Sequence, residues 1–347
     1  MALGTNHSTV TTSANFIPEL WSDEVIAAYK SQLVLANLVT KLSFKGKKGD
    51  TLHIPVPARG AASAKAANTA VSFIADTAGV VDVLINKHFH YAKMYEDIAE
   101  MQAKSSMRRF YTEDAGYSLA KQVDQDLHLL GAGFQGGSIA GATNLYELAV
   151  IGGDGSTAFS GSANTNTGNG TAMTDAGLRK MIQTLEDQDV NSTELSLIIP
   201  PVEANVLRGI ARFTEQAFIG DGSAIKTGRL GNLYGVEIFQ TSNCPFIHVN
   251  SVTGTQSVTF TSTAPTGATF ADAFALTVDW DSTSPSDTKY RAGLLLHKDA
   301  MAHAEQMAIR TQSDYLIDFL GTAVVTDTVY GVKELRDYAA LAFIVPS

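Results

Sequence analysis

The sequence predicts an α+β fold in which helices and strands do not alternate regularly. Between residues 107 and 133, apolar or small side chains recur at spacings of three and four, which is typical of one face of a long α-helix. The short apolar runs at residues 195–199 and 339–345 have the length and composition of buried strands. Since no regular βαβ order links these elements, we expect an α+β arrangement rather than a doubly wound sheet.

The composition indicates a folded chain whose surface carries little charge. Of 347 residues, 45% are hydrophobic and 17% are charged, and the net charge is −10. This balance argues against electrostatic wrapping of nucleic acid, which needs clustered Lys and Arg. The single cysteine, Cys244, forms no disulfide within the chain, which fits a reducing compartment. The sequence shows neither a signal-peptide pattern nor an apolar run near the ~20 residues of a membrane span.

Residues 1–45 are expected to form an N-terminal arm. Residues 1–15 are rich in Ser, Thr and Asn, and an amphipathic helical segment containing Trp21 follows them. The next apolar stretch runs over residues 33–42. An arm this apolar, placed before any compact unit, needs a surface to lie on, and another subunit can supply that surface.

Residues 46–91 predict a long β-hairpin, because apolar and polar side chains alternate in both of its limbs. Pro55 and Pro57 lack the N–H donors of a ladder, so their strand is expected at an edge or in a free ribbon. The small, polar connection between the limbs carries Arg59 and Lys65. A two-stranded ribbon is marginal alone in water, so this one is expected to rest on a neighbour.

The remaining elements are expected to follow one another along the chain. Their ranges are a helical approach at 94–104, the long helix, a Gly-rich loop at 133–170, a helix at 175–189 capped by Thr174, a strand at 195–199, a short helix at 202–212, a loop at 214–229, a strand at 236–240, a small β insertion at about 250–290, a strand at 294–297, the segments 304–320 and 322–335, and the terminal strand.

A glycine-rich motif and the single cysteine could suggest a nucleotide site and a nucleophile, but simpler structural roles are the preferred interpretations. Residues 131–136 satisfy the pattern GxGxxG, yet they follow a helix and open none, so the phosphate-cradling geometry of a dinucleotide site is absent. Cys244 precedes a proline and has no basic residue near it in sequence, which favours a quiet, buried thiol over a nucleophile. An enzyme with a site in a Gly-rich loop remains an alternative that lacks a catalytic group.

Two groups of side chains could suggest a metal site. Asp124 and His128 are four residues apart on one helix face while Asp126 points away, and we expect a face that is solvated or paired with another subunit. His88 and His90 lie on one side of a strand without further ligands nearby, so surface histidines are the expectation. The sequence predicts no catalytic residue, no cofactor and no metal.

Basic residues gather at two places. Lys45, Lys47 and Lys48 lie at the base of the hairpin, and Arg108 and Arg109 begin the long helix. Either group could face an enclosed genome. Ion pairs with acidic neighbours are the preferred interpretation.

Five stretches, given with their residue numbers, carry a resemblance to a known family. They are FIPELWSDEVIAAYKSQLVLANLVTK (16–41), KGKKGDTLHIPVPARGAASAKAANT (45–69), RRFYTEDAGYSLAKQVDQDL (108–127), GRLGNLYGVEIFQTSNCP (228–245) and GVKELRDYAALAFIV (331–345). In these stretches and in the order of its parts, the chain resembles the major capsid proteins of tailed bacteriophages, which have the Hong Kong 97-like fold. The likeness is greatest to those of short-tailed podoviruses, including cyanophages.

The resemblance implies a division of the chain into an arm, a hairpin and two domains. They are the N-terminal arm (1–45), the extended E-loop hairpin lying over an adjacent subunit (46–93), the peripheral domain (94–190 and 300–335) with its spine helix (107–131), and the axial domain (191–299 and 336–347) with its β insertion. Some relatives cross-link a Lys of the hairpin to an Asn of a neighbour. Lys65 lies near the hairpin tip, but neither a catalytic Glu nor an acceptor Asn can be matched, so no cross-link is predicted.

The resemblance also implies the function. The chain would be a non-enzymatic capsid protein of the virion that assembles in the bacterial cytoplasm into pentamers and hexamers of an icosahedral shell. The shell would enclose double-stranded DNA without reading its sequence and without a membrane, with a scaffolding protein, a portal and a possible decoration protein as partners. An encapsulin-type compartment is the alternative. The candidate contacts between subunits are Trp21, Pro55, Pro57, Arg59, Lys65, Arg108, Arg109, Lys226 and Arg229.

Overall fold

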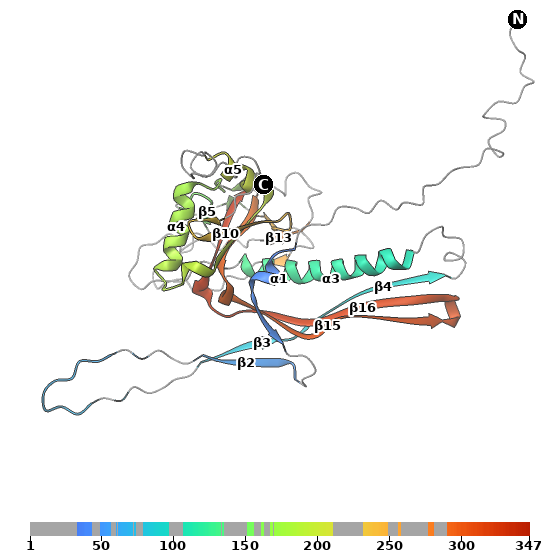
Figure 1. Ribbon diagram of the computed structural model, residues 1–347, viewed down its shortest axis with the longest axis horizontal. Helices are drawn as coiled ribbons and strands as arrows, with labels where there is room; N and C mark the ends of the chain where they lie inside the picture. The colour runs from blue at the N-terminus through green and yellow to red at the C-terminus, as the bar shows by residue number, and fades with distance from the viewer. Residues whose placement is uncertain are drawn as a thin grey trace, which may run out of the picture.

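The structure is a computed structural model with a long sheet, a second sheet and a protruding hairpin (Figure 1). It describes residues 33–43, 49–56, 60, 62–71, 73, 79–96, 107–132, 134, 151–155, 161–162, 167–168, 170–210, 232–248, 256–257, 277–280 and 290–347. Trp21 and the predicted arm helix, the loop at 214–229 and most of the insertion at 250–290 lie outside these residues. No described helix is long and apolar enough to cross a membrane.

The long sheet has four strands in the order β1-β15-β16-β4. Its strands are β1 (Thr40–Ser43), β15 (Met301–Leu316), β16 (Gly321–Glu334) and β4 (Lys87–Glu96). β15 and β16 form an antiparallel hairpin, turned by a 3₁₀-helix, η5 (Ile317–Phe319), and interrupted by register shifts between Glu305 and Arg310. The segments predicted at 304–320 and 322–335 are therefore the two limbs of one long ribbon.

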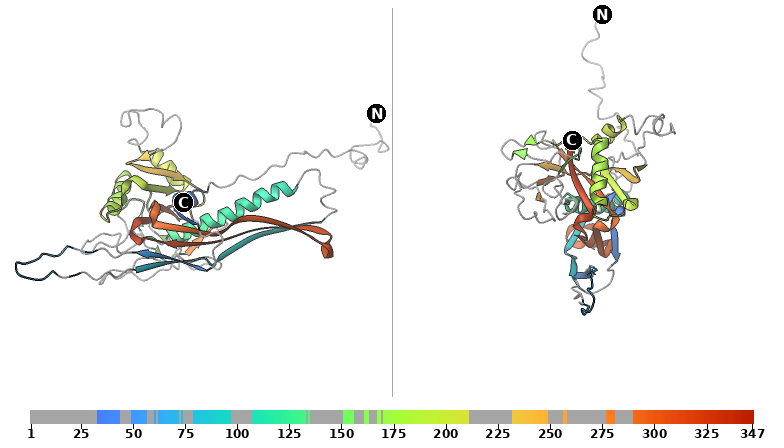
Figure 2. Two further views of the ribbon diagram at one scale, coloured as in Figure 1. Left: turned by 60° about the horizontal axis from the view of Figure 1, so that its bottom comes forward. Right: turned by 90° about the vertical axis from the view of Figure 1, so that its left-hand side faces the viewer.

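The 25-residue helix α3 (Met107–Gly131) runs along the long sheet, as Figure 2 shows from two further sides. Its bounds agree closely with the predicted helix, and Gly131 ends it where a Cβ would come within 2.7 Å of the Leu294 side chain. The four-residue helix α1 (Leu35–Leu38) contacts it near one end. Apolar side chains of α3 such as Leu127, which is fully buried, join the core of the second sheet.

The second sheet has nine strands with β14 (Tyr290–His297) at its centre. The other strands are β5 (Ile151–Gly152), β8 (Leu195–Ile199), β9 (Asn232–Leu233), β10 (Val236–Gln240), β11 (Phe246–His248), β12 (Gln256–Ser257), β13 (Thr277–Asp279) and β17 (Ala340–Pro346). The predicted strands at 195–199, 236–240, 294–297 and 339–345 all lie in this sheet. The apolar runs of β8, β14 and β17 reflect burial of both faces, whereas β10 carries the exposed Glu237 and Gln240.

Two helices complete the lobe that contains the second sheet. α4 (Asp175–Glu186) begins where predicted, because the Thr174 hydroxyl accepts the Gly177 N–H at 3.0 Å. It ends three residues earlier than predicted. α5 (Pro201–Arg208) carries Pro201 in its first turn and is shorter than the predicted 202–212. A small hairpin of β6 (Gly161–Ser162) and β7 (Thr167–Gly168) and the short 3₁₀-helix η3 (Ser192–Glu194) are the remaining elements of this region.

Two chain crossings join the long sheet to the second sheet. One is the 3₁₀-helix η4 (Lys298–Ala300) between β14 and β15, and the other is η6 (Asp337–Ala339) between β16 and β17. The Ala300 carbonyl accepts the N–H groups of Leu335 at 2.8 Å and Arg336 at 3.2 Å. A single backbone oxygen therefore ties the two crossings together.

The predicted long hairpin is present, but its returning limb divides into two strands. β2 (Thr51–Val56) pairs with β3 (Gly79–Leu84) in an antiparallel ribbon. Residues 87–96 leave this ribbon and pair with β16, so the prediction that 81–91 form one limb is wrong beyond Leu84. The predicted helical approach at 94–104 is also wrong at its start, because residues 94–96 are the end of β4. Pairing with β16 overrode the local helical pattern.

Candidate functional site

The β2–β3 ribbon is anchored at its base and exposed along its length. Val83 is fully buried, and Ile85 packs with it near Ala304. Farther out, Val56 is 45% exposed and Val80 is 60% exposed. Figure 1 shows the ribbon continuing into a long loop that leaves the body of the molecule. Exposed apolar side chains on a two-stranded ribbon are typical of a surface that another molecule covers.

The predicted contact residues are only partly described. Pro55 lies in β2 opposite Val80, and Lys65 is exposed in the loop. Arg108 and Arg109 lie in the first turn of α3, but their side chains are outside the described part of the chain. The candidates Trp21, Pro57, Arg59, Lys226 and Arg229, and the basic residues Lys45, Lys47 and Lys48, also lie outside it.

Asp124 and His128 lie on a face of α3 that was predicted to be solvated or paired with another subunit. Both side chains are instead buried within the chain. Asp124 has no exposed surface, and its two carboxylate oxygens accept the Leu35 N–H at 2.9 Å and the Asn243 amide at 2.7 Å. The prediction of a solvated or subunit-paired face for Asp124 and His128 is therefore wrong. Asp124 instead joins α1 and the turn before β11 to the long helix, and its removal would leave two buried donors without an acceptor.

Asp126 ties the same helix to the long sheet, and it is also buried. It accepts the Tyr330 hydroxyl of β16 at 2.6 Å and pairs with Lys87 of β4 at 3.0 Å. Burial, followed by the neighbouring Asp126 carboxylate, raises the pKa of Tyr330, so its phenol remains a donor. Asp124 and Asp126 thus face two different parts of the fold, and their carboxylates bind groups of the protein itself.

Aromatic contacts continue this helix-to-sheet joint toward the start of α3. The rings of Tyr95 and Tyr111 stack with centroids 5.7 Å apart, and the Lys93 ammonium lies 3.6 Å from the Tyr111 centroid. The Tyr91 hydroxyl donates to Asp114 at 3.3 Å. The helix is therefore held to β4 and β16 along its length by side chains whose sequence spacing alone does not reveal their pairing.

His128 makes the stability of this joint dependent on pH. Burial lowers its pKa from 6.5 to about 4, and the Asp124 carboxylate, 3.6 Å away, opposes that shift in part. Between these two pH values the unfolded chain binds a proton that the folded chain does not bind. Stability is therefore lost as the pH falls from 6.5 to about 4.

Between about pH 7 and about pH 4, we expect the free energy of unfolding of His128→Gln to decrease by about 3 kcal/mol less than that of the wild type. The measurement is the free energy of unfolding by denaturant at both pH values, for the wild type and the variant. Burial also lowers the pKa of His303. Because His303 is present in both the wild type and the variant, its contribution to the pH dependence of stability is the same in both. An equal pH dependence in the two chains would contradict the assignment.

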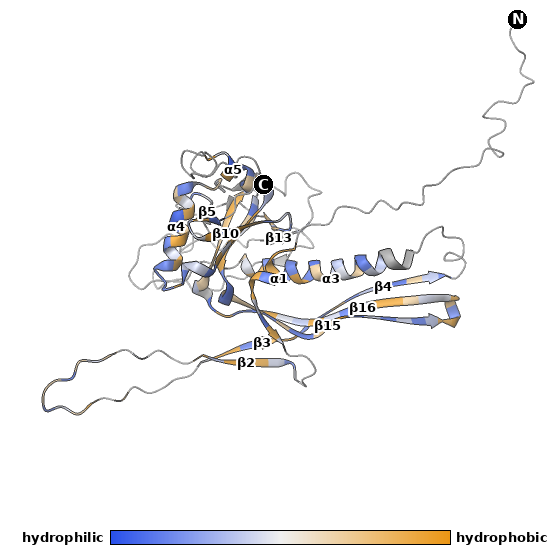
Figure 3. Cartoon of the chain, in the orientation of Figure 1, coloured by the Kyte–Doolittle hydropathy of each residue, from blue (hydrophilic) through white to orange (hydrophobic). Residues whose placement is uncertain are grey.

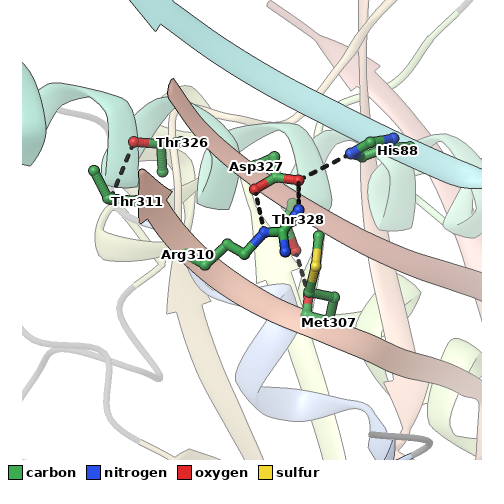
Figure 4. A network of polar contacts seen from close by, with 7 residues as sticks. All are labelled: His88, Met307, Arg310, Thr311, Thr326, Asp327 and Thr328. Atoms are coloured by element: carbon green, nitrogen blue, oxygen red, sulfur yellow. Dashed lines mark hydrogen bonds and ion pairs between the residues drawn. The ribbon is translucent and has the colours of Figure 1, made fainter. Parts of the chain in front are cut away.

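A polar network crosses the outer face of the long sheet (Figure 4). Arg310 of β15 binds Asp327 of β16 through two bonds of 2.8 Å and 3.0 Å, and His88 of β4 lies 3.1 Å from the same carboxylate. The Arg310 guanidinium and, to a smaller extent, His88 lower the pKa of Asp327. His88 and His90 are exposed, as predicted, although the contact of His88 with Asp327 was not foreseen. The bulge before Arg310 brings it opposite Asp327.

The other predicted chemical motifs have structural roles in the described residues. Burial raises the pKa of the Cys244 thiol to about 12, which confirms the prediction of a quiet thiol. Gly131 ends α3 and Ala132 follows it in a turn, and most of the remaining residues of the GxGxxG motif lie outside the described part of the chain. Within the described ranges, no three His, Cys, Asp or Glu side chains lie close enough together to hold a metal.

Sequence reasoning missed a second exposed apolar region, at the turn between β15 and β16. We call residues 315–320 the distal tip. Its exposed fractions are 46% for Tyr315, 37% for Leu316, 77% for Ile317, 61% for Phe319 and 64% for Leu320. The sequence-based prediction placed these residues at the end of the segment 304–320 and indicated neither a turn nor an exposed surface there. Residues 315–320 consist of five large apolar residues and one acid, Asp318. An acid within such a short apolar run could have indicated an exposed apolar surface.

Comparison with known proteins identifies the fold. Neither a protein-family model nor a curated protein matches the chain. Among solved structures, a chain from Mycobacterium phage Che8 is similar over 95% of this chain and 97% of its own, with a TM-score of 0.65 and 21% identity. The capsid structure of the cyanophage P-SCSP1u matches over 99% of this chain and 96% of its own, with a TM-score of 0.67 and 17% identity.

The capsid of the cyanophage Pam1 is similar over 99% of both chains, with a TM-score of 0.64 and 12% identity. These likenesses span the long helix, both sheets and the protruding hairpin together, because they cover nearly the whole chain. At such identities they establish the fold. The chain therefore has the Hong Kong 97-like fold found in phage capsid structures.

Proposed function

We propose that this chain is a major capsid protein that assembles into the icosahedral shell of a tailed phage. The observation that carries the proposal is the full-length likeness of its fold to phage capsid structures. Exposed apolar side chains at the long hairpin and at the distal tip support it, because a subunit that works alone has no use for two such surfaces.

In this proposal the mechanism is geometric and needs no catalytic group. Each subunit extends its hairpin over an adjacent subunit, so apolar ribbon surface is buried only in the assembly. The residues 46–93 are the E-loop, 94–190 with 300–335 the peripheral domain, and 191–299 with 336–347 the axial domain. Pro55 and Lys65, together with the undescribed candidates, lie in contacts between subunits.

The proposed partners are further copies of the chain, in pentamers and hexamers, and the enclosed double-stranded DNA. A scaffolding protein and a portal would act during assembly in the host cytoplasm, and a decoration protein could bind the finished shell. The net charge of −10 fits a container that holds DNA without wrapping it tightly.

The test is light scattering and electron microscopy of the purified chain, alone and after coexpression with neighbouring phage proteins. We expect closed particles in the megadalton range, and an absorbance ratio that indicates nucleic acid when the particles come from infected cells. A monodisperse monomer under every condition would overturn the proposal. Particles from the native host that contain protein cargo and no nucleic acid would favour an encapsulin-type compartment instead.

A further inference from the structure

A cavity of about 320 Å³ lies at the junction between the two sheets, and we call it the junction cavity. Its described lining residues come from the turn that follows α4 (188–191), from the end of β14 (His297) and from the crossing to β17 (336, 338 and 339). Figure 3 shows hydrophobic colour giving way to hydrophilic colour where the second sheet meets the long sheet. Ligand cavities in proteins begin at about 300 Å³, so this one has room for a small molecule.

The composition of the lining narrows the kind of ligand. Among the described lining residues, Val190 and Ala339 are the only aliphatic ones, so the walls do not favour an apolar molecule. Asp189 is the only carboxylate among them. A single carboxylate falls short of the oxygen ligands that Ca²⁺ or Mg²⁺ requires. The lining therefore favours a polar ligand that is not a metal ion.

The Gln188 side chain presents a donor that the fold does not use. Its Nε2 atom is buried and has no hydrogen-bond partner among the groups of the protein. A buried donor without an acceptor is costly, and native structures retain few of them. An acceptor oxygen that enters the cavity would remove this cost. Gln188 therefore indicates a ligand that accepts hydrogen bonds.

His297 and Asn191 also present N–H groups, because the other polar atom of each side chain is already bonded. His297 Nδ1 accepts the Asp299 N–H at 3.2 Å, so the ring proton lies on Nε2. This Nε2 lies 3.7 Å from a Glu194 carboxylate oxygen, which is longer than a hydrogen bond. Asn191 Oδ1 accepts the Thr193 N–H at 3.1 Å, which leaves its amide nitrogen as a donor. Three lining side chains thus offer donors.

The charges around the junction cavity limit the charge of its ligand. Arg336 is exposed and forms no ion pair with another described residue, so its guanidinium can bind an anion. Asp189 is also exposed and balances that charge within the lining. Glu194, which is 60% exposed, adds a negative charge beside His297. Because the positive charge is not in excess, the site disfavours a polyanion and suits a small anion held mainly by neutral donors.

We propose that the junction cavity binds a small oxyanion, the phosphate or carboxylate group of a small molecule. Gln188, His297 and Asn191 donate to its oxygens, and Arg336 pairs with its charge. The bound group links the turn after α4 to the crossing between the two sheets, because both line the cavity. This inference is independent of the proposed shell function, since it needs only the folded chain.

The first test is isothermal titration calorimetry of the purified full chain with inorganic phosphate and, separately, with succinate. Sodium chloride keeps the ionic strength constant in both titrations. We expect one site per chain with an affinity in the millimolar range. Tighter binding of phosphate would identify a phosphoryl ligand, and tighter binding of succinate would identify a carboxylate. Absence of binding for both anions would overturn the inference.

Substitutions locate the bound anion. We expect Gln188→Met to weaken binding by roughly threefold to tenfold, as the loss of one hydrogen bond implies. Arg336→Gln should weaken it by at least about tenfold, because a charge-assisted bond is lost. Arg179→Gln is the matched control, because it removes the same charge near the other end of α4, where Arg179 pairs with Asp175. Unchanged binding in both cavity variants, or equal weakening in the control, would show an adventitious ion only and reject the site.

Two further measurements separate a binding role from a structural one. Without oxyanions in the buffer, Gln188→Met should have a thermal midpoint equal to or above that of the wild type, because the buried Nε2 donor has no partner to lose. A lower midpoint would show that the amide has a structural partner and contradict the inference. Saturating phosphate or succinate should slow amide hydrogen exchange at residues 188–191 and 336–339. Protection confined to other segments would place the anion elsewhere and overturn the assignment.

Discussion

Leu127→Asp is expected to prevent the chain from folding. Leu127 is fully buried where α3 meets the core of the second sheet, and Asp124 and Asp126 already occupy neighbouring buried positions. A third carboxylate there would have no described partner, and burying an unpaired charge costs several kcal/mol or more. That cost is comparable with the total stability of about 5–15 kcal/mol that is usual for a protein domain.

The measurement is the soluble yield and the far-UV circular dichroism of the purified chain, followed by thermal unfolding. Leu127→Met is the matched control, and it should cost less than about 1.5 kcal/mol because it conserves volume and apolar character. Leu127→Ala should fall between them, at about 2–5 kcal/mol. Unchanged thermal unfolding of Leu127→Asp would show that α3 does not bury this face.

Replacement of residues 57–78 by Asn-Gly is expected to leave a folded subunit that cannot form closed shells. The dipeptide suits a tight turn between Val56 and Gly79, which are paired at the ends of β2 and β3. The buried base of the ribbon at Val83 and Ile85 remains. The reach of the hairpin to a second copy is lost, and with it the proposed contact between subunits.

The measurement pairs thermal unfolding of the variant with electron microscopy under conditions in which the wild type assembles. Lys65→Arg is the control, because it keeps the loop and its charge but removes the amine that an isopeptide cross-link would need. We expect normal shells from this control. Full-sized shells from the shortened chain would refute the role of the hairpin in assembly.

The sequence was sufficient to predict the elements whose information is local. The spacing of apolar side chains located α3, Thr174 marked the start of α4, and apolar runs located β8 and β17. In each case the signal lies within one segment, where burial and capping act over a few residues. The α+β class followed from the irregular succession of these segments.

The environment of Asp124 and Asp126 could not be predicted, because their partners are distant in the sequence. Asp124 binds groups 89 and 119 residues away, and Asp126 binds Tyr330 across 204 residues. The periodicity of an amphipathic helix predicts that acidic side chains face solvent. Here hydrogen-bond partners from distant parts of the chain allow the two acids to be buried instead. The division of 81–91 between β3 and β4 has the same origin, because β16 competes with β2 for the returning limb.

The carbonyl of Ala300, which binds the backbone at Leu335 and Arg336, also has a mechanical consequence. The ribbon of β15 and β16 extends from this crossing for roughly 50 Å, which is the length expected of the 16-residue strand β15. It can therefore be compared with a lever that pivots near Ala300. A rotation of about 5° at the pivot moves the free end of such a lever by roughly 4 Å, a distance comparable with the thickness of a side chain. The direction of the distal end therefore depends on how firmly this crossing and the contacts of α3 with β4 and β16 hold the ribbon.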